Sequence, residues 1–153
     1  HIAGSGAGDE AEALRARMEA MPHVLLHGQV SQARLAELMR AANVFVLPSY
    51  YEGLPLVLVE AAASGCRVVA TDLPGVRELA DALGPWLDRV QVPRLERVDQ
   101  PVADDLPDFV ARLSRTLRDA LCTEAPTQPP DLRRWTWRAV FRRVEDVWCD
   151  LLG

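Results

Sequence analysis

In this chain of 153 residues, the two side chains whose type and position most clearly suggest a chemical role are Glu52 and Glu60. Glu52 follows the apolar run Val44–Leu47 in a polar stretch, whereas Glu60 lies within the apolar run Val57–Ala63. A carboxylate among apolar residues is costly unless a partner satisfies it. We therefore expect Glu60 to be half-buried and to serve a function.

The local sequence around these glutamates predicts a strand, a loop, a helix and a second strand. Val44–Leu47 is short and apolar, as buried parallel strands are, and the proline after it ends the hydrogen-bonding ladder. Pro55 suits the start of a helix and Gly65 the left-handed position after its end, which predicts a helix over roughly residues 55–64. The apolar run Arg67–Thr71 completes a βαβ unit.

The loop of this unit lies at the carboxyl end of its first strand. Helical side chains lean toward the helix N-terminus, so Glu60 can face the same crevice as Glu52. We expect free amides of Gly53, Leu54 and Leu56 to line this crevice, where the helix dipole favours phosphate. Carboxylates for sugar hydroxyls beside amides for a diphosphate predict a nucleotide-sugar site.

The rest of the chain predicts further alternation of strands and helices. Loops that start at Gly4, Gly28, Pro48 and Thr71 each follow an expected strand. We expect them to leave one edge of a single parallel sheet, which is where open α/β sheets bind ligands. The predicted fold is α/β, with a doubly wound parallel sheet. The further expected elements are strands at 23–28 and around 90–92, helices at 9–20, 32–42 and 76–83, a helix from 104–107 to about 121, and a last helix from 136.

Composition excludes several classes of protein. The net charge of −5 argues against a general nucleic-acid binder, and no apolar run approaches the length of a membrane span. With three histidines and no Cys or carboxylate at ligand spacing, we expect no metal site, and His27 is expected to be structural. Cys66, Cys122 and Cys149 are expected to be free thiols in the core of a cytoplasmic protein.

A basic and aromatic cluster near the end of the chain allows two interpretations. Arg133–Arg138, with Arg142 and Arg143, resembles the composition of nucleic-acid or membrane-surface patches. Aromatic residues at helical spacing more often form a packing face, and acidic residues farther along dilute the charge. We favour the packing interpretation.

The stretch that holds both glutamates also resembles a known family. Its motif is Leu-Pro-Ser-x-x-Glu-Gly-Leu-Pro-Leu-Val-Leu-Val-Glu-Ala, followed by Ala-Ser-Gly-Cys-Arg-Val-Val-Ala-Thr-Asp. This pattern is similar to the Glu-x7-Glu region of retaining GT-B glycosyltransferases of family 4, the glycosyl transferases group 1. The resemblance is continuous from about Ile2 to Leu79, and beyond Leu83 the sequence departs from the usual pattern.

The resemblance implies a role for each residue of the predicted site. Glu52, the expected catalytic residue, contacts the hydroxyls of the donor hexose, and Glu60 binds the ribose. Gly53 and Leu54, together with Leu56, bind the donor sugar and its diphosphate.

The resemblance also places two segments from earlier in the chain at the nucleotide. The Gly-rich turn at Gly4 and Gly6 lies near the nucleotide, although a turn required by geometry alone is the better interpretation of a lone Gly-x-Gly. The loop from Gly28 to Val30 meets the base through its backbone.

The implied reaction is transfer of a hexose from a nucleotide-diphosphate sugar to a glycan, lipid or other acceptor, with retention of configuration and no cofactor. The setting implied is bacterial polysaccharide biosynthesis in the cytoplasm, with peripheral association of a full-length protein at the inner membrane face left open. Residues 1–122 would form the Rossmann-like donor domain without its first βα unit, 123–135 a Pro-rich linker and 136–153 a C-terminal helix. The N-terminal GT-B domain, with the Arg and Lys that meet the diphosphate, would lie outside this chain, which alone should bind donor weakly and transfer nothing.

Two alternatives remain open from the residues. The first is a non-catalytic nucleotide-binding or interaction module on the same sheet, and the second is a sugar-nucleotide epimerase or hydrolase of GT-B architecture. The substitution Glu60→Leu distinguishes the first, because a pure scaffold would gain stability from an apolar residue at a half-buried position.

Overall fold

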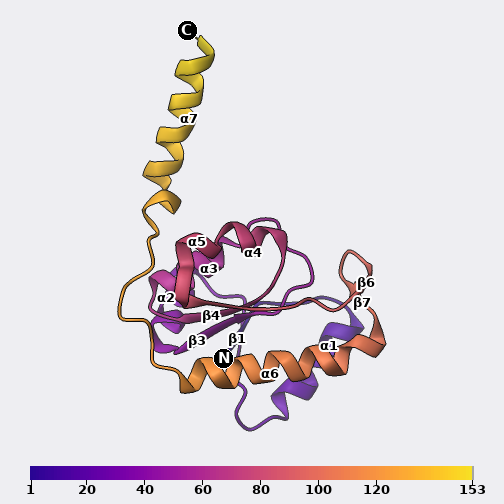
Figure 1. Cartoon of the computed structure of the whole chain (residues 1–153). Coiled ribbons are helices and arrows are strands. Elements are labelled where there is room, and N and C mark those ends of the chain that lie inside the picture. Colours follow the sequence, from indigo (N-terminus) through magenta and orange to yellow (C-terminus); the bar gives the residue numbers. More distant parts are fainter. Residues whose placement is uncertain (153) are drawn as a thin grey trace.

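The computed structural model describes residues 1–152 and has the predicted α/β character (Figure 1). Its strands are β1 (Ile2–Ala3), β2 (Leu26–Gly28), β3 (Val44–Leu47), β4 (Arg67–Thr71), β5 (Leu87–Val90), β6 (Leu95–Arg97) and β7 (Gln100–Pro101). Its helices are α1 (Asp9–Glu19), α2 (Gln32–Ala41), α3 (Leu56–Ala63), α4 (Pro74–Glu78), α5 (Ala80–Leu83), α6 (Leu106–Cys122) and α7 (Trp137–Leu152).

The centre of the molecule is a parallel sheet in the order β3-β4-β5. Val44 lies opposite Arg67 across the first pair of strands, and Val68 lies opposite Leu87 across the second. An ion pair of 2.6 Å between Arg67 Nε and Asp88 Oδ2 also joins β4 to β5. The β3–α3–β4 segment is the βαβ unit predicted from the sequence.

Helices cover both faces of this sheet. Successive residues of a strand point to opposite sides, so each strand contributes side chains to both interfaces. Val68 and Ala70 of β4 belong to the core beneath α2 and α3, whereas Val69 packs with Phe109 of α6 on the other face. Figure 1 shows α2 to α5 on one side of β3 and β4, and α6 on the other. The doubly wound α/β fold is confirmed.

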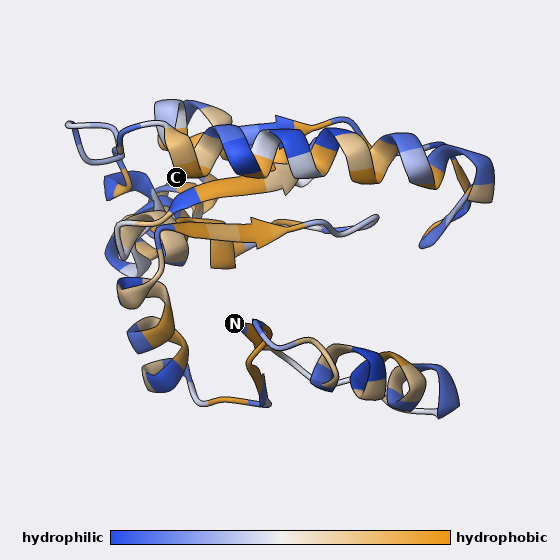
Figure 2. Ribbon diagram, turned by 90° about the horizontal axis from the view of Figure 1, so that it is seen from below, coloured by the Kyte–Doolittle hydropathy of each residue, from blue (hydrophilic) through white to orange (hydrophobic). Residues whose placement is uncertain are grey.

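The expectation of one continuous parallel sheet was wrong. Strands β1 and β2 pair in parallel with each other, but they form a sheet separate from β3-β4-β5. Figure 2 shows the N-terminal unit apart from the central strands. The four loops therefore leave two sheets, because neither β1 nor β2 is hydrogen-bonded to β3.

Several expected boundaries also shift. The strand expected around residues 90–92 is β5, and it begins earlier because its pairing with β4 starts at Leu87. The helix expected over 76–83 is divided into α4 and α5 at Leu79. The strand expected over 23–28 is limited to β2, and Pro55 is the cap of α3 rather than its first residue.

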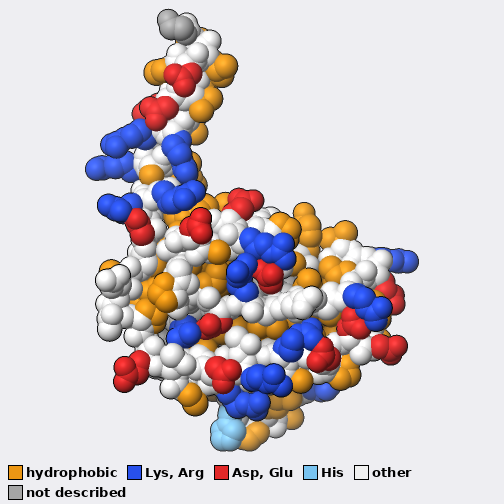
Figure 3. Space-filling view, viewed as in Figure 1, with side chains coloured by type: hydrophobic (Ala, Val, Ile, Leu, Met, Phe, Trp, Pro, Cys, Tyr) orange, Lys and Arg blue, Asp and Glu red, His pale blue; other side chains and the backbone are white. Residues whose placement is uncertain are grey.

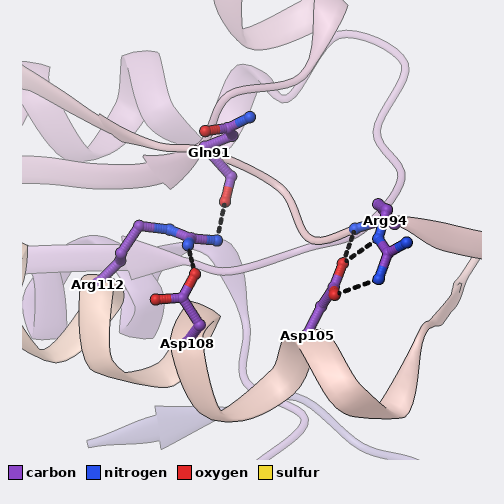
Figure 4. A network of polar contacts seen from close by, with 5 residues as sticks. All are labelled: Gln91, Arg94, Asp105, Asp108 and Arg112. Carbon is purple, nitrogen blue, oxygen red and sulfur yellow. Dashed lines mark hydrogen bonds and ion pairs between the residues drawn. The ribbon is translucent and has the colours of Figure 1, made fainter.

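The connection from β5 to α6 is held by charged side chains (Figure 4). Asp105, just before α6, accepts hydrogen bonds from the Arg94 amide at 3.0 Å and from its Nε at 2.9 Å. Farther along α6, Arg112 pairs with Asp108 and donates to the Gln91 carbonyl at 3.5 Å. These contacts join the chain after β5 to the helix that covers one face of the sheet.

The chain after α6 returns across the domain before α7 begins. Trp86 Nε1 donates to the Gln128 carbonyl at 2.8 Å, and both Leu132 and Trp135 pack against the core beneath α3. Helix α7 then projects away from the sheet, as Figure 1 shows. The expected linker is thus anchored at several points.

The cysteines occupy two kinds of environment. Cys66 is buried and its thiol donates to the Met39 carbonyl at 2.9 Å, and burial raises its pKa. Cys122 and Cys149 are exposed free thiols, so the expectation of a core position was wrong for both. They lie on the solvent sides of α6 and α7.

Candidate functional site

The loop after β3 holds Glu52 in a defined orientation. Ser49 Oγ donates a hydrogen bond of 2.7 Å to Glu52 Oε1, and both residues are partly buried. Sequence reasoning did not single out Ser49, although its spacing of three residues from Glu52 is the Ser-x-x-Glu spacing of capping interactions. Ser49 leaves the second carboxylate oxygen, Oε2, available to a ligand.

The amides beside Glu52 differ in their availability. The amides of Gly53 and Leu54 donate to no protein acceptor within residues 1–152. The amide of Leu56 instead donates to the Leu54 carbonyl at 2.9 Å, so the expectation that it is free was wrong. This bond closes the turn that brings the chain into α3, and the Gly53 and Leu54 amides remain for an anion at the N-terminus of the helix.

The same loop lies directly against the start of α4. A Cβ atom placed on Gly75 would be 1.6 Å from the Gly53 carbonyl oxygen and 3.3 Å from the Leu54 Cα. Only glycine permits so close an approach of two backbones. Gly75 therefore fixes how the Glu52 loop rests on the start of α4, a contact that sequence reasoning did not predict.

Glu60 is exposed, and the expectation that it is half-buried was wrong. Helix α3 packs through Leu58, Ala61 and Ala62, which are at most 2% exposed. At about 100° per residue, Glu60 lies roughly opposite that face. Apolar neighbours in sequence did not bury Glu60, because they surround only part of the helix, so Glu60→Leu no longer separates a scaffold from a nucleotide site by its stability.

The glycines predicted to meet a nucleotide lie together at the N-terminal unit. The Gly4 amide donates to the Gly28 carbonyl at 2.8 Å, and both glycines have a positive φ, of 132° and 61°. Gly6 faces Ala11 of α1 so closely that an added Cβ would be 2.8 Å from the Ala11 Cβ. Gly4, Gly6 and Gly28 line a hollow of about 830 Å³ beside α1.

A second concavity lies between the N-terminal unit and β3. It has a volume of about 940 Å³, and Gly4, Val30 and Pro48 are among its lining residues. The structure thus brings Val30 to the end of β3, but the linings of the two concavities do not include Glu52 or Glu60. The predicted site residues form two groups, one on the loop and helix after β3 and one on the N-terminal unit.

The carboxyl end of β4 carries a charged cluster beside the site. Asp72 accepts hydrogen bonds from Arg77 Nη2 at 3.0 Å and from Arg89 Nη1 at 2.9 Å. The hydrogen bond from Arg77, supported by the charge of Arg89, lowers the pKa of Asp72. Asp72 therefore holds both guanidinium groups at this edge of the sheet.

Two histidines of the N-terminal unit contact each other. His27 Nε2 lies 2.8 Å from His1 Nδ1, and the two rings are stacked. Within residues 1–152, no three His, Cys, Asp or Glu side chains are grouped as a metal site requires. No helix in the same range has both the length and the apolar character needed to cross a bilayer.

Comparison with known proteins shows which family this chain resembles. Residues 1–119 match the family described as Glycosyl transferases group 1. The chain belongs to this family. The resemblance based on the Glu52–Glu60 region is thereby confirmed.

Relatives in this family come from several bacteria. D-inositol 3-phosphate glycosyltransferase of Streptomyces griseus is 37% identical over 101 residues, which cover 65% of this chain and 21% of the relative. Phosphatidyl-myo-inositol mannosyltransferase of Mycobacterium tuberculosis is 39% identical over 155 residues, covering 99% of this chain and 38% of the relative. The enzyme of the same name from Mycolicibacterium smegmatis is 42% identical over 78 residues, covering 50% of this chain and 20% of the relative. The chain spans between 20% and 38% of the length of these relatives.

Proposed function

We propose that this chain is the donor-binding domain of a retaining glycosyltransferase. The enzyme would transfer a hexose from a nucleotide-diphosphate sugar to a glycan, lipid or other acceptor. The observation that carries the proposal is the family match over residues 1–119, which includes the Glu52 loop and α3. Relatives named for glycosyl transfer to an inositol phosphate and to a phosphatidyl-inositol support acceptors of these classes.

The loop after β3 supplies the donor contacts in this proposal. The Glu52 carboxylate, held by Ser49, accepts hydrogen bonds from the hexose hydroxyls. The amides of Gly53 and Leu54 donate to the diphosphate at the positive end of the α3 dipole. The Leu56 amide takes no part, because it is engaged by the Leu54 carbonyl.

The nucleotide itself is bound by residues from both groups. Glu60, which solvent reaches, accepts hydrogen bonds from the ribose hydroxyls, and Val30 meets the base through its backbone. The turn at Gly4 and Gly6 and the loop at Gly28 complete the nucleotide contacts. Catalysis then consists of positioning the donor and stabilising the departing diphosphate, without a protein nucleophile or a cofactor.

The setting of the reaction follows from the same proposal. The protein acts in the cytoplasm in bacterial glycan or glycolipid synthesis, and a full-length enzyme with a lipid acceptor works at the inner membrane face. As a separate domain, residues 1–153 bind donor weakly and transfer no sugar, since the acceptor-binding half of a GT-B enzyme is a second domain.

Calorimetric titration tests this function directly. Residues 1–153 are titrated with UDP, GDP and ADP and their hexose conjugates, alongside Glu60→Ala and the control Glu145→Ala on the projecting helix α7. We expect one nucleotide to bind, with a dissociation constant on the order of millimolar, to be lost in Glu60→Ala and to be kept in Glu145→Ala. Equal binding by all three proteins contradicts the role of Glu60, and absence of binding by the full-length enzyme contradicts the donor-domain function.

A further inference from the structure

Helix α7 has one apolar face that the rest of the described chain leaves largely uncovered. At 100° per residue, the apolar side chains of this helix gather within about 140° of its surface. They are Trp137, Val140, Phe141, Val144, Val147, Trp148, Leu151 and Leu152. No residue of α7 is buried, and Val147 and Leu151 are 55% and 78% exposed. The helix projects away from the sheet, so the domain itself does not pack on this face (Figure 1).

The charges of α7 are separated along the helix. All of its basic residues precede Val144 and all of its acidic residues follow it (Figure 3). The two sets are Arg138, Arg142 and Arg143, and Glu145, Asp146 and Asp150. Because the positive end of a helix dipole is at the N-terminus, this order is unfavourable in an isolated helix. Among residues 1–152, no ion pair includes a residue of α7, so a partner with the reverse order of charges would compensate both halves.

The sequence of α7 has the same pattern in both directions from Val144, with the charges inverted. Apolar residues stand three, four and seven positions away on each side. Each basic residue before Val144 has an acidic residue at the same distance after it, as Arg143 has Glu145 and Arg138 has Asp150. A second copy of α7 that runs in the opposite direction therefore presents apolar residues to apolar residues and an acidic half to a basic half.

We propose that α7 pairs with α7 of a second copy of this chain, as an antiparallel dimer centred on Val144. Residues seven positions apart lie on the same side of a helix. Arg138 and Glu145 therefore border one side of the apolar face, and Arg143 and Asp150 border the other. Two-fold symmetry brings the same border of each copy together. Arg138 then lies beside Glu145 of the partner subunit, and Arg143 beside Asp150 of the partner subunit.

Opposite charges on both borders select the antiparallel orientation. A parallel pair would place the two basic halves side by side and the two acidic halves side by side, which repel. Because α7 projects away from the sheet, this pairing does not involve the loops of the candidate site (Figure 1). The inference is therefore testable whether or not the chain binds a nucleotide.

Charge reversal at the two borders tests the pairing. The acidic variant carries Arg138→Glu with Arg143→Glu, and the basic variant carries Glu145→Arg with Asp150→Arg. Sedimentation velocity should show a dimer of the wild type and a dissociation constant raised by about tenfold or more in either variant alone. An equimolar mixture of the two variants should dimerise within about threefold of the wild type, because opposite charges then meet again. Mixing would not repair a simple loss of folding in either variant.

A matched control changes the net charge by the same amount away from the borders. It carries Arg118→Glu on α6 with Arg142→Glu on the polar side of α7, and both arginines are exposed. This control should dimerise within about twofold of the wild type. If it dimerised as weakly as the acidic variant, net charge rather than pairing of the borders would be responsible.

Cross-linking determines the orientation of the two helices. Val144→Cys and Leu151→Cys are each introduced with Cys122→Ser and Cys149→Ser, while the buried Cys66 is kept, and both chains are treated with a short bismaleimide. The two copies of residue 144 meet at the centre of the dimer and should be linked. The two copies of residue 151 lie about 20 Å apart along the helix axis of an antiparallel pair and should not be linked.

Three results would overturn the proposal. These are a wild type that stays monomeric at every concentration, an acidic variant that dimerises like the wild type, and efficient cross-linking of Leu151→Cys. A monomeric wild type that sediments with phosphatidylglycerol vesicles would assign the apolar face to a lipid surface. A full-length enzyme that is monomeric and protects the amides of α7 from hydrogen exchange would assign it to another domain of the same chain.

Discussion

At the scale of single residues, Asp105 is bound by three hydrogen-bond donors of one arginine. It accepts hydrogen bonds from the amide, Nε and Nη2 of Arg94 at 3.0, 2.9 and 2.8 Å (Figure 4). The side-chain hydrogen bonds from Arg94, together with the one from its amide, lower the pKa of Asp105 from 3.8 to about 2. The ionised carboxylate thereby joins the chain after β5 to the start of α6.

The lowered pKa predicts a loss of stability in acid. A carboxyl whose pKa is lower in the folded state than in the unfolded state stabilises the fold at pH values above its unfolded-state pKa. That stability is lost as the pH falls through the folded-state pKa. We therefore expect the unfolding free energy of the wild type to fall more steeply from about pH 4 to about pH 2 than that of Asp105→Asn. Urea denaturation followed by circular dichroism at several pH values measures the difference. The neighbouring Asp104→Asn should retain the wild-type slope, and identical slopes for all three proteins would contradict the ion pair.

At the scale of elements, the Glu52 loop rests against the start of α4. The contact between Gly75 and Gly53 joins the loop after β3 to the start of α4. A residue that lies outside the β3–α3–β4 unit thus helps to determine where the candidate donor contacts lie.

This contact predicts unequal effects of two glycine substitutions. In Gly75→Ala the added methyl group meets the Gly53 carbonyl, so the loop or α4 must move, at a cost of about 1–3 kcal/mol in unfolding free energy. The matched control is Gly53→Ala, where an added Cβ has no atom within 4 Å, and it should cost less than about 1 kcal/mol. Chemical denaturation of both variants decides the point. If the two variants were equally stable, the Glu52 loop and α4 would not be in the contact described.

At the scale of the whole molecule, α7 has an apolar face without a partner in the described chain. Its aromatic residues Trp137, Phe141 and Trp148 are 73%, 60% and 63% exposed. Figure 3 shows apolar side chains along α7 and basic side chains near its base. Because these side chains are exposed, the favoured packing interpretation of this stripe stays a prediction.

An uncovered stripe of this kind predicts self-association of the chain. Substituting Trp137→Glu together with Trp148→Glu places two charges on the stripe and should shift the chain to monomer without lowering its melting temperature. Sedimentation velocity over a range of concentrations measures the first effect and calorimetry the second. Arg142→Glu, which changes a charge on another side of the helix, is the control and should associate like the wild type. A monomeric wild type, or a marked loss of melting temperature in the double variant, would show that the stripe is not free.

The sequence alone predicted the β3–α3–β4 unit and the doubly wound fold. The signals for them are local: the apolar runs of Val44–Leu47 and Arg67–Thr71 and the glycine after α3, which has a φ of 93°. Each depends on the conformational preferences of a few neighbouring residues, so each can be recognised without knowledge of the rest of the chain.

Only the tertiary structure decided how these units meet. It showed that Glu60 is exposed, that Ser49 holds Glu52, that Gly75 supports the Glu52 loop, and that β1 and β2 are separated from β3 by a groove. Burial of a helical residue depends on which face the neighbouring elements cover, and pairing of strands depends on segments far apart in sequence. Neither property is contained in the local pattern from which the elements were predicted.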